Sequence, residues 1–354
     1  MAKKRKMYSD YRRPRRKRGS LLLKIIVVLL LLVLAAFLVF SKVLGGSVKI
    51  VDGKLDFILP GSQEEPPPAD PEVTETPPLV IIEPSEEPTD QPEPEPEPDP
   101  VPPIISAIEV PIERLLDGSA VQGAADAGAN AIVVTMKPTS GELAWSSEDT
   151  AVPDAVRALA QESELHLVAR VACFRDQALV KAGTGGPLTT PSGRGWYDYY
   201  GMRWVSPVSD EVRGYLIRLC VELCDMGFDE ILLEFAGYPY FGETHVLGTN
   251  ELRPEDLTAP VEQFWQEMSM ALSETDVLLS ALVADEMVAG TDEYSGIGPE
   301  LLTLYADRVW VKPGETDCVT PLEQAGMEQA AQRIVYIGGT EEDVSRAEMK
   351  NVIG

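Results

Sequence analysis

The segment GMRWVSPVSDEVRGYLIRLCVELCDMGFDEILLEFAGYP, from Gly201 to Pro239, predicts a capped helix followed directly by a strand. Ser209 precedes the helical pattern with a hydroxyl suited to an N-cap, and Gly227 follows it where a helix stop favours glycine. The apolar run Glu230–Phe235 then has the length and composition of a strand. A strand joined in this way to an amphipathic helix favours a parallel α/β fold.

The same alternation of short apolar strands and amphipathic helices runs from residue 104 to residue 354. Strand candidates are Ile105–Val110, Ala131–Met136, Leu165–Cys173, Glu230–Phe235, Val277–Val283, Arg308–Val311 and Arg333–Ile337. Helix candidates are Ser119–Ala127, Pro153–Glu162, Ser209–Met226, Pro260–Glu274, Gly298–Tyr305, Pro321–Ala331 and Thr340–Met349. Seven strand-then-helix units predict an α/β (β/α)8 TIM-type barrel. An eighth strand is not evident, so an incomplete barrel or an open doubly wound sheet is the second interpretation.

The first 41 residues have the pattern of a membrane anchor. Residues 1–40 hold eleven Lys or Arg residues against one acid, Asp10, and all but Lys24 precede the apolar run Leu21–Phe40. About 20 apolar residues cross a bilayer core, and flanking basic residues stay on the cytoplasmic side. We therefore expect a basic cytoplasmic tail over 1–20, a single transmembrane anchor over 21–41 and an extracytoplasmic C-terminal domain. A cleaved signal peptide is the alternative, although no clear small-x-small cleavage site follows the run.

Two further segments connect the anchor to the predicted barrel of residues 104–354. The juxtamembrane stretch 42–60 contains SVKIVDGKLDFIL, which predicts either a hairpin turning at Asp52-Gly53 or an extended lead-in. Residues 61–103 hold 15 Pro and 13 acidic residues with no Lys or Arg. This composition predicts a disordered, extended linker, either a stalk that holds the domain away from the membrane or a tether of no required length.

Charge and cysteine content exclude several classes of function. The net charge is −27, and beyond residue 40 the chain has 19 basic and 56 acidic residues, so phosphates of nucleic acid would be repelled. The four cysteines and two histidines do not form a ligand pattern for zinc or a disulfide framework. Phosphate-cradling loops and G-x-S-x-G elbows are also missing from the sequence. We therefore expect no metal, no cofactor and no nucleic-acid partner.

Three stretches resemble a bacterial family described as a putative glycosyl hydrolase domain, a TIM barrel related to alpha-amylase-type enzymes. They are NAIVVTMKPTSGELAW (Asn130–Trp145), LHLVARVACFRDQALV (Leu165–Val180) and the Gly201–Pro239 segment. The last is similar to the family's W-V-D-P motif, a helix, and then G-F-D-E-I-x-F-D-Y-x-R-F-P. The resemblance implies a barrel that acts on polysaccharide.

The chain departs from the family pattern at several polar positions, as expected of a divergent member. Thr135 stands where the family has Asp on the second strand, although Lys137 is kept. Ser206 replaces the Asp of W-V-D-P, and Gly237 replaces the Arg that follows the fourth strand. On that strand Glu234 stands for Asp and Phe235 for Tyr. These changes put catalysis of the family's type in doubt.

Functional groups of parallel barrels lie just beyond the carboxyl ends of the strands. Glycoside cleavage needs two carboxyl groups, one of them with a raised pKa. Glu234 closes an apolar run, which would raise its pKa, and its best partners are Asp285 and Glu286. The alternatives are that Glu234 pairs with Arg170 as a structural ion pair, or binds ligand without chemistry, and that Asp285 and Glu286 are solvated loop acids.

Candidate substrate-binding residues lie on the same strand ends and in two aromatic clusters. They are Lys137, Arg170, Asp176, Trp204 and Tyr238. The clusters are Trp196, Tyr197, Tyr199, Tyr200 and Trp204 in the first, and Tyr238, Tyr240 and Phe241 in the second. Aromatic faces stack on sugar rings, so the clusters form either a glycan platform or packing for the loop. An ion pair between Arg175 and Asp176 is also expected.

These observations leave three hypotheses of function open. In the first, the protein is a membrane-anchored glycoside hydrolase acting on cell-envelope or extracellular polysaccharide. In the second, the domain is a catalytically degenerate module that binds glycan or a protein partner in the envelope. A structural role as a wall-spanning scaffold is a third possibility. Fold alone does not decide between them.

Overall fold

The computed structural model describes residues 48–51, 54–57, 101–146, 148–314, 316–350 and 352. The chain divides into two compact units, Met1–Gln91 and Pro92–Gly354. In the first unit, β1 (Val48–Val51) pairs antiparallel with β2 (Lys54–Phe57), which confirms the predicted strand pair. Its turn, the basic tail 1–20, the anchor 21–41 and residues 58–100 lie outside the described part. Within that part, no helix is both long and apolar enough to cross a membrane.

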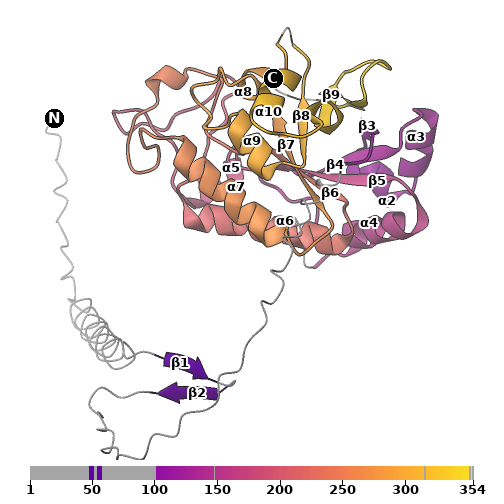
Figure 1. Ribbon diagram of the computed structural model, residues 1–354, viewed down its shortest axis with the longest axis horizontal. Helices are drawn as coiled ribbons and strands as arrows, with labels where there is room; N and C mark the ends of the chain where they lie inside the picture. Colours follow the sequence, from indigo (N-terminus) through magenta and orange to yellow (C-terminus); the bar gives the residue numbers. More distant parts are fainter. Residues whose placement is uncertain are drawn as a thin grey trace, which may run out of the picture. The chain divides into compact units, whose positions relative to one another are not determined.

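The second unit contains a closed barrel of eight parallel strands (Figure 1). They are β3 (Ser106–Glu109), β4 (Ala131–Lys137), β5 (His166–Ala172), β6 (Glu230–Glu234), β7 (Leu278–Val283), β8 (Arg308–Val311), β9 (Ile334–Ile337) and β10 (Ser345–Glu348). Each strand pairs with its neighbour in sequence, and β10 closes the ring by pairing with both β9 and β3. The predicted (β/α)8 barrel is therefore confirmed, and it is complete.

The eighth strand lies where the sequence predicted a helix. The expectation of a helix over Thr340–Met349 is wrong, because Ser345–Glu348 form β10. Arg346 pairs in register with Ser106 of β3 and with Tyr336 of β9. The strand is short and polar, and only the small side chains of Ser345 and Ala347 are buried. Backbone pairing with β3 and β9, rather than amino-acid composition, makes this segment a strand. The sequence pattern that would predict a strand here is therefore weak.

Helices cover the outside of the barrel, and α6 and α7 lie side by side on one flank (Figure 1). The main helices are α3 (Ala120–Asp126), α4 (Ala151–Glu162), α6 (Asp210–Met226), α7 (Thr258–Leu272) and α9 (Pro299–Tyr305). The shorter ones are α2 (Ile112–Leu116), α5 (Gln177–Ala182), α8 (Asp285–Val288), α10 (Val319–Gln324) and α11 (Ala330–Arg333). The predicted helix Pro321–Ala331 is thus two helices, separated at Gly326, which has a φ of 101°.

Helix α6 shows how local sequence sets the boundaries of an element. The Ser209 hydroxyl accepts a hydrogen bond from the Val212 amide, and Gly227 ends the helix with a φ of 103°. Both caps were predicted. One face of the helix, including Leu216, Cys220 and Leu223, is buried against the barrel. This packing fixes the direction in which β6 enters the sheet.

Alternate residues of each strand point into the barrel and fill it in layers. The interior cluster contains mainly aliphatic side chains from all eight strands, with Trp310 as the largest member. Layers of side chains of this kind make the barrel a packed core and not a pore. Polar inward-pointing side chains are therefore confined to the two ends of the barrel.

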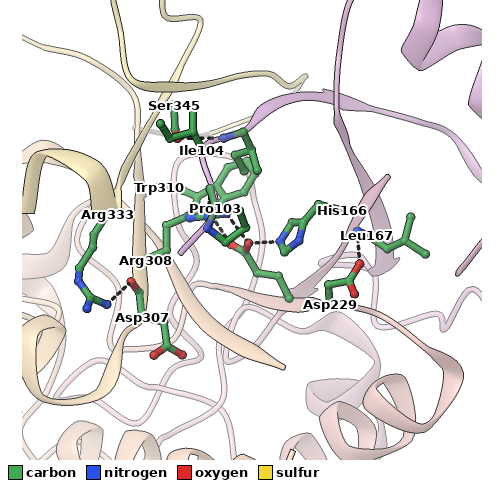
Figure 2. Close-up of polar contacts among 12 residues, drawn as sticks. Pro103, Ile104, His166, Leu167, Asp229, Asp307, Arg308, Trp310, Arg333 and Ser345 are labelled. Atoms are coloured by element: carbon green, nitrogen blue, oxygen red, sulfur yellow. Dashed lines mark hydrogen bonds and ion pairs between the residues drawn. The ribbon is translucent and has the colours of Figure 1, made fainter. Parts of the chain in front are cut away.

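The amino-terminal end of the barrel is closed by a buried ionic layer around Glu230 (Figure 2). Glu230 Oε2 accepts a hydrogen bond from Arg308 Nη1 at 2.7 Å and lies 2.8 Å from His166 Nε2. Glu230 Oε1 accepts a hydrogen bond from Trp310 Nε1 at 2.6 Å. Arg308 also donates to the carbonyl of Pro103, which ties the entry of the chain to the barrel. Because both oxygens of Glu230 are engaged by polar or cationic partners inside the barrel, this layer is a structural element.

Candidate functional site

The opposite end, where the strands finish, holds four inward-pointing polar residues from four successive strands. They are Glu109 of β3, Thr135 of β4, Arg170 of β5 and Glu234 of β6. Arg170 donates from Nε to Glu234 Oε2 at 2.9 Å and from Nη2 to Oε1 at 2.7 Å. Both oxygens of Glu234 are thereby engaged in a bidentate ion pair, and the residue is only 5% exposed.

Glu109 extends this ion pair into a cluster. Its Oε1 accepts from Arg170 Nη1 at 3.3 Å and from the Thr135 hydroxyl at 3.1 Å. Its Oε2 accepts from the backbone amide of Lys350 at 2.7 Å, and the Lys350 carbonyl accepts from Arg170 at 3.4 Å. Met349 and Val352 pack against the interior cluster on either side of Lys350. The segment after β10 therefore covers the part of the mouth above Glu109 and Arg170.

The electrostatics of Glu234 follow from burial and from this pairing. Burial raises the pKa of Glu234, and the Arg170 guanidinium opposes that rise without cancelling it. Burial also acts to lower the pKa of Arg170, but the charges of Glu234 and Glu109 outweigh it and leave that pKa raised. The pKa of Glu234 is thus raised, as the sequence predicted for a catalytic acid. Glu234 also forms the ion pair with Arg170 that the sequence offered as the alternative.

Arg175 lies beside this cluster among aromatic rings. Its guanidinium is 5.0 Å from the centre of the Phe235 ring and 5.4 Å from that of Phe241. It donates to Asp198 Oδ2 at 2.7 Å, so the expected pair with Asp176 is wrong. The polypeptide reverses direction between Arg175 and Asp198. The partner of Arg175 therefore comes from this loop and not from the next residue in the sequence.

Four predicted substrate-binding residues are buried and serve the scaffold. Lys137 lies 2.6 Å from Asp176 in an ion pair whose side chains are 0% and 1% exposed. Asp176 also caps α5 by accepting from the Leu179 amide. Trp204 is fully buried with its indole N–H on Asp198, and Tyr238 is 1% exposed. All four side chains are therefore buried in this structure, and a part for them in binding substrate stays a prediction.

Two departures from the family motif have structural explanations. A Cβ atom added at Gly237 would lie 2.5 Å from the carbonyl oxygen of Ser295, so no larger residue fits here without a shift of the backbone. The loop that contains Ser295 therefore occupies the space beside Gly237, and Tyr238 donates its amide to the same carbonyl at 2.8 Å. Ser206 and the Tyr238 hydroxyl both donate to the carbonyl of Leu252, which anchors the loop after β6.

An open cavity of about 400 Å³ lies beside the cluster, formed by the loops after β5, β6 and β7. Its lining includes five aromatic residues, Tyr199, Tyr200, Tyr240, Phe241 and Tyr294. Tyr199 and Tyr200 are 72% and 64% exposed, whereas Trp196 from the same predicted cluster is buried. The aromatic platform is therefore formed by the tyrosines, while the tryptophans pack the loop. Asp198 shapes this platform by accepting from the Tyr200 amide at 2.9 Å.

Tyr240 connects the cavity to the buried cluster. Burial raises the pKa of its phenol, and the charges of Glu234, Asp292 and Glu286 act in the same direction. Its ring packs edge-on against Phe241, with centroids 4.9 Å apart. The ring therefore lies between the Arg170–Glu234 pair and the carboxylates of the cavity.

Asp285 and Glu286, the other predicted catalytic residues, begin α8. Glu286 lines the cavity, whereas the Asp285 carboxylate lies beside Gly314 and is not among the lining residues. The two side chains share a hydrogen bond. Burial works to raise the pKa of Asp285, but hydrogen bonds from Thr316 and Glu286 hold it below the usual value. A backbone hydrogen bond works to lower the pKa of Glu286, but the shared bond, burial and the neighbouring acids leave it raised.

The sequence prediction missed Glu109 and the loop Thr291–Tyr294. Glu109 ends a strand that was correctly predicted, so the rule that located Glu234 applies to it equally. The loop carries Asp292, Glu293 and Tyr294 into the cavity. It lies after a helix that was not predicted, and nothing in its own pattern marks it. In the described part of the chain, no group of three or more His, Cys, Asp or Glu residues is arranged to hold a metal ion.

The fold and the mouth define a TIM barrel of glycoside-hydrolase type. Residues 106–311 match the family model described as "Putative glycosyl hydrolase domain", which covers more than half of the chain. The chain therefore belongs to this family, as the resemblance of its three motifs predicted. Among curated protein sequences, none matches the chain.

Solved structures that the chain resembles show low sequence identity. A hypothetical protein from Ruminiclostridium thermocellum is 22% identical with a TM-score of 0.40, and the match covers 49% of this chain and 96% of that one. A Group IV chitinase from Ostrinia furnacalis is 14% identical with a TM-score of 0.42, covering 66% of each chain. The PgaB (BpsB) glycoside hydrolase domain from Bordetella bronchiseptica is 13% identical with a TM-score of 0.42, covering 66% of this chain and 84% of that one.

Proposed function

We propose that the barrel binds polysaccharide in the tyrosine-lined cavity, and that Glu234 is a structural residue that takes no part in catalysis. The observation that carries this proposal is the bidentate Arg170–Glu234 pair beside an open aromatic cavity. Membership of a glycosyl hydrolase family supports a carbohydrate as the ligand. Exposed tyrosine faces suit sugar rings, which present apolar C–H surfaces for stacking.

Three features of Glu234 favour a structural role over cleavage at this position. A general acid must carry a proton and reach the glycosidic oxygen, and a nucleophile must present a free oxygen. Both oxygens of Glu234 instead accept from Arg170, and its side chain is 6% exposed. The mouth above Arg170 is covered by the backbone of Lys350.

A second candidate function is hydrolysis by Asp285 and Glu286. The specific observation in its favour is that these adjacent carboxyl groups have pKa values shifted in opposite directions, and that Glu286 lines the cavity. One ionised group and one protonated group are what glycoside cleavage requires. In this alternative, Glu286 would be the acid and Asp285 the carboxylate.

We further propose that the domain acts outside the cytoplasm, held at the cell membrane by the apolar run Leu21–Phe40. The support for this comes from the sequence alone, in the basic residues that precede the run and the acidic proline-rich segment that follows it. Polysaccharide of the cell envelope would then be the material within reach of the cavity.

The experiment compares two tyrosines of one loop. The full chain is incubated with a panel of wall and storage polysaccharides, and both retention on the polymer and release of reducing ends are measured. Tyr199→Ala removes a ring of the cavity, whereas Tyr197→Ala removes a similarly exposed ring that contacts Arg203 outside it. We expect Tyr199→Ala to lose retention and Tyr197→Ala to keep it, with no reducing ends released.

Other outcomes assign the function differently. Equal retention by both variants would contradict the placement of the ligand in the cavity. Release of reducing ends that is abolished by Glu286→Gln would establish the second candidate. Release abolished by Glu234→Gln would overturn the proposal that Glu234 is structural.

A further inference from the structure

The cavity combines its aromatic rings with unbalanced negative charge. Glu286, Asp292 and Glu293 lie in its wall, and no Lys or Arg is among the described residues that line it. None of the three acids forms an ion pair within the described part of the chain, although the described barrel contains buried ion pairs elsewhere. Asp292 Oδ2 accepts from the Ser295 amide at 2.8 Å, but no cation in the described wall of the cavity neutralises the charge of the three acids.

The nearby cation does not compensate this charge. Arg175 packs against the Tyr200 and Phe241 rings at 5.4 Å, but it is 5% exposed and is already paired with Asp198 at 2.7 Å. The charges of Asp285 and Asp292 repel that of the Glu286 carboxylate and raise its pKa. A positively charged group entering the cavity would relieve that repulsion.

From this combination we infer that the cavity selects a glycan bearing protonated amino groups, such as a chain rich in glucosamine. This inference rests on the proposed function and names the chemistry of its ligand. The tyrosine faces stack on the sugar ring and also attract an ammonium group. The carboxylates recognise the same ammonium by charge. A neutral sugar would use the rings but would gain nothing from the three acids.

The charge of the whole chain favours the same ligand. Beyond residue 40 there are 19 basic and 56 acidic residues, so the protein attracts polycations and repels polyanions. Polysaccharides carrying uronic acid or phosphate groups are therefore disfavoured. Between a cationic glycan and a lysine-rich peptide, the flat exposed faces of Tyr199 and Tyr200 favour the glycan, because sugar rings stack on such faces.

The test uses matched pairs of oligosaccharides and the full chain. Glucosamine and N-acetylglucosamine oligomers of one length and linkage differ in the acetyl group that removes the charge on each nitrogen, and binding of each is measured by calorimetry at low and high salt. We expect the glucosamine oligomer to bind at least several-fold more tightly, and this preference to shrink as salt screens the charges. Glu286→Gln and Glu293→Gln should each reduce its affinity about threefold, the scale of one exposed charge pair.

Controls separate failure of this inference from failure of the proposed function. Glu113→Gln removes an equally exposed acid on α2 and should leave both affinities unchanged. Equal or tighter binding of the N-acetylated oligomer would overturn the inference while the proposed function stands. Binding of neither oligomer, nor of any neutral glycan, would overturn both. Binding of a lysine-rich peptide as tight as that of the glucosamine oligomer would overturn the assignment to a glycan.

Discussion

Arg170 and Glu234 face each other on adjacent strands of the barrel, joined by two parallel hydrogen bonds of 2.9 and 2.7 Å. Removing one partner of a buried pair leaves an uncompensated charge and costs about 3–5 kcal/mol, whereas replacing both with apolar groups is often neutral. We therefore expect Arg170→Met to lower the free energy of unfolding by about that amount, as measured by urea denaturation. The double variant Arg170→Met/Glu234→Leu should recover most of the loss. A double variant as unstable as the single one would contradict a structural role for the pair.

The ionic layer at the other end predicts a dependence of stability on pH. Burial opposes ionisation of Glu230, but the His166 hydrogen bond and the Arg308 charge outweigh it and lower the pKa of Glu230 below 4.5. A carboxyl group whose pKa is lower in the folded state stabilises the fold above the unfolded pKa, and this contribution is lost as pH falls through the folded pKa. The Tm difference between wild type and Glu230→Gln should therefore be largest near neutral pH and narrow below about pH 4.5. A difference that stays constant with pH would contradict this account.

Gly237 predicts a steric effect on the cavity. A Cβ atom there would meet the Ser295 carbonyl at 2.5 Å, so Gly237→Ala must displace the loop that supplies Asp292 and Tyr294. We expect this variant to lose retention on polysaccharide. Gly214→Ala is the matched control, because a Cβ at this position in α6 meets nothing closer than 3.5 Å. Loss of retention in both variants would indicate a general effect on folding.

The contact of Lys350 with Glu109 is made by its backbone amide, so its contribution to stability should not depend on the Lys350 side chain. Its amide donates to Glu109 at 2.7 Å, and proline has no amide hydrogen to donate. Lys350→Pro should lower the free energy of unfolding by about 1–3 kcal/mol, the cost of a lost hydrogen bond to a charged group. Lys350→Ala keeps the amide and should be close to wild type. Equal stability of the two variants would show that the segment after β10 does not hold Glu109.

Much of the fold could be predicted because local signals and tertiary structure agree. The caps of α6 at Ser209 and Gly227 lie where the sequence placed them, and seven of the eight barrel strands were predicted. The eighth, Ser345–Glu348, has no apolar run, since its only buried side chains are Ser345 and Ala347. Its identity depends on pairing with β9, which precedes it, and with β3, which is far away in the sequence, and periodicity reveals neither pairing.

The candidate site was predictable in part, for the same reason. The rule that polar groups follow strand ends located Arg170, Glu234, Asp285 and Glu286 at the mouth. It did not indicate which strand-end residues would be buried. Lys137 and Asp176, for example, form a buried ion pair with each other. Which aromatic residues face the cavity depends on the path of the loops, and that path is fixed by long-range contacts such as Arg175 with Asp198.

The most direct test of the central claim compares wild type with Glu234→Gln on the polysaccharide that the protein retains best. The substitution keeps the size of the side chain and removes its charge, while retention and released reducing ends are measured on the same samples. Our account predicts retention by both proteins, with no reducing ends from either. Reducing ends released by wild type and absent with Glu234→Gln would contradict it and make Glu234 a catalytic residue.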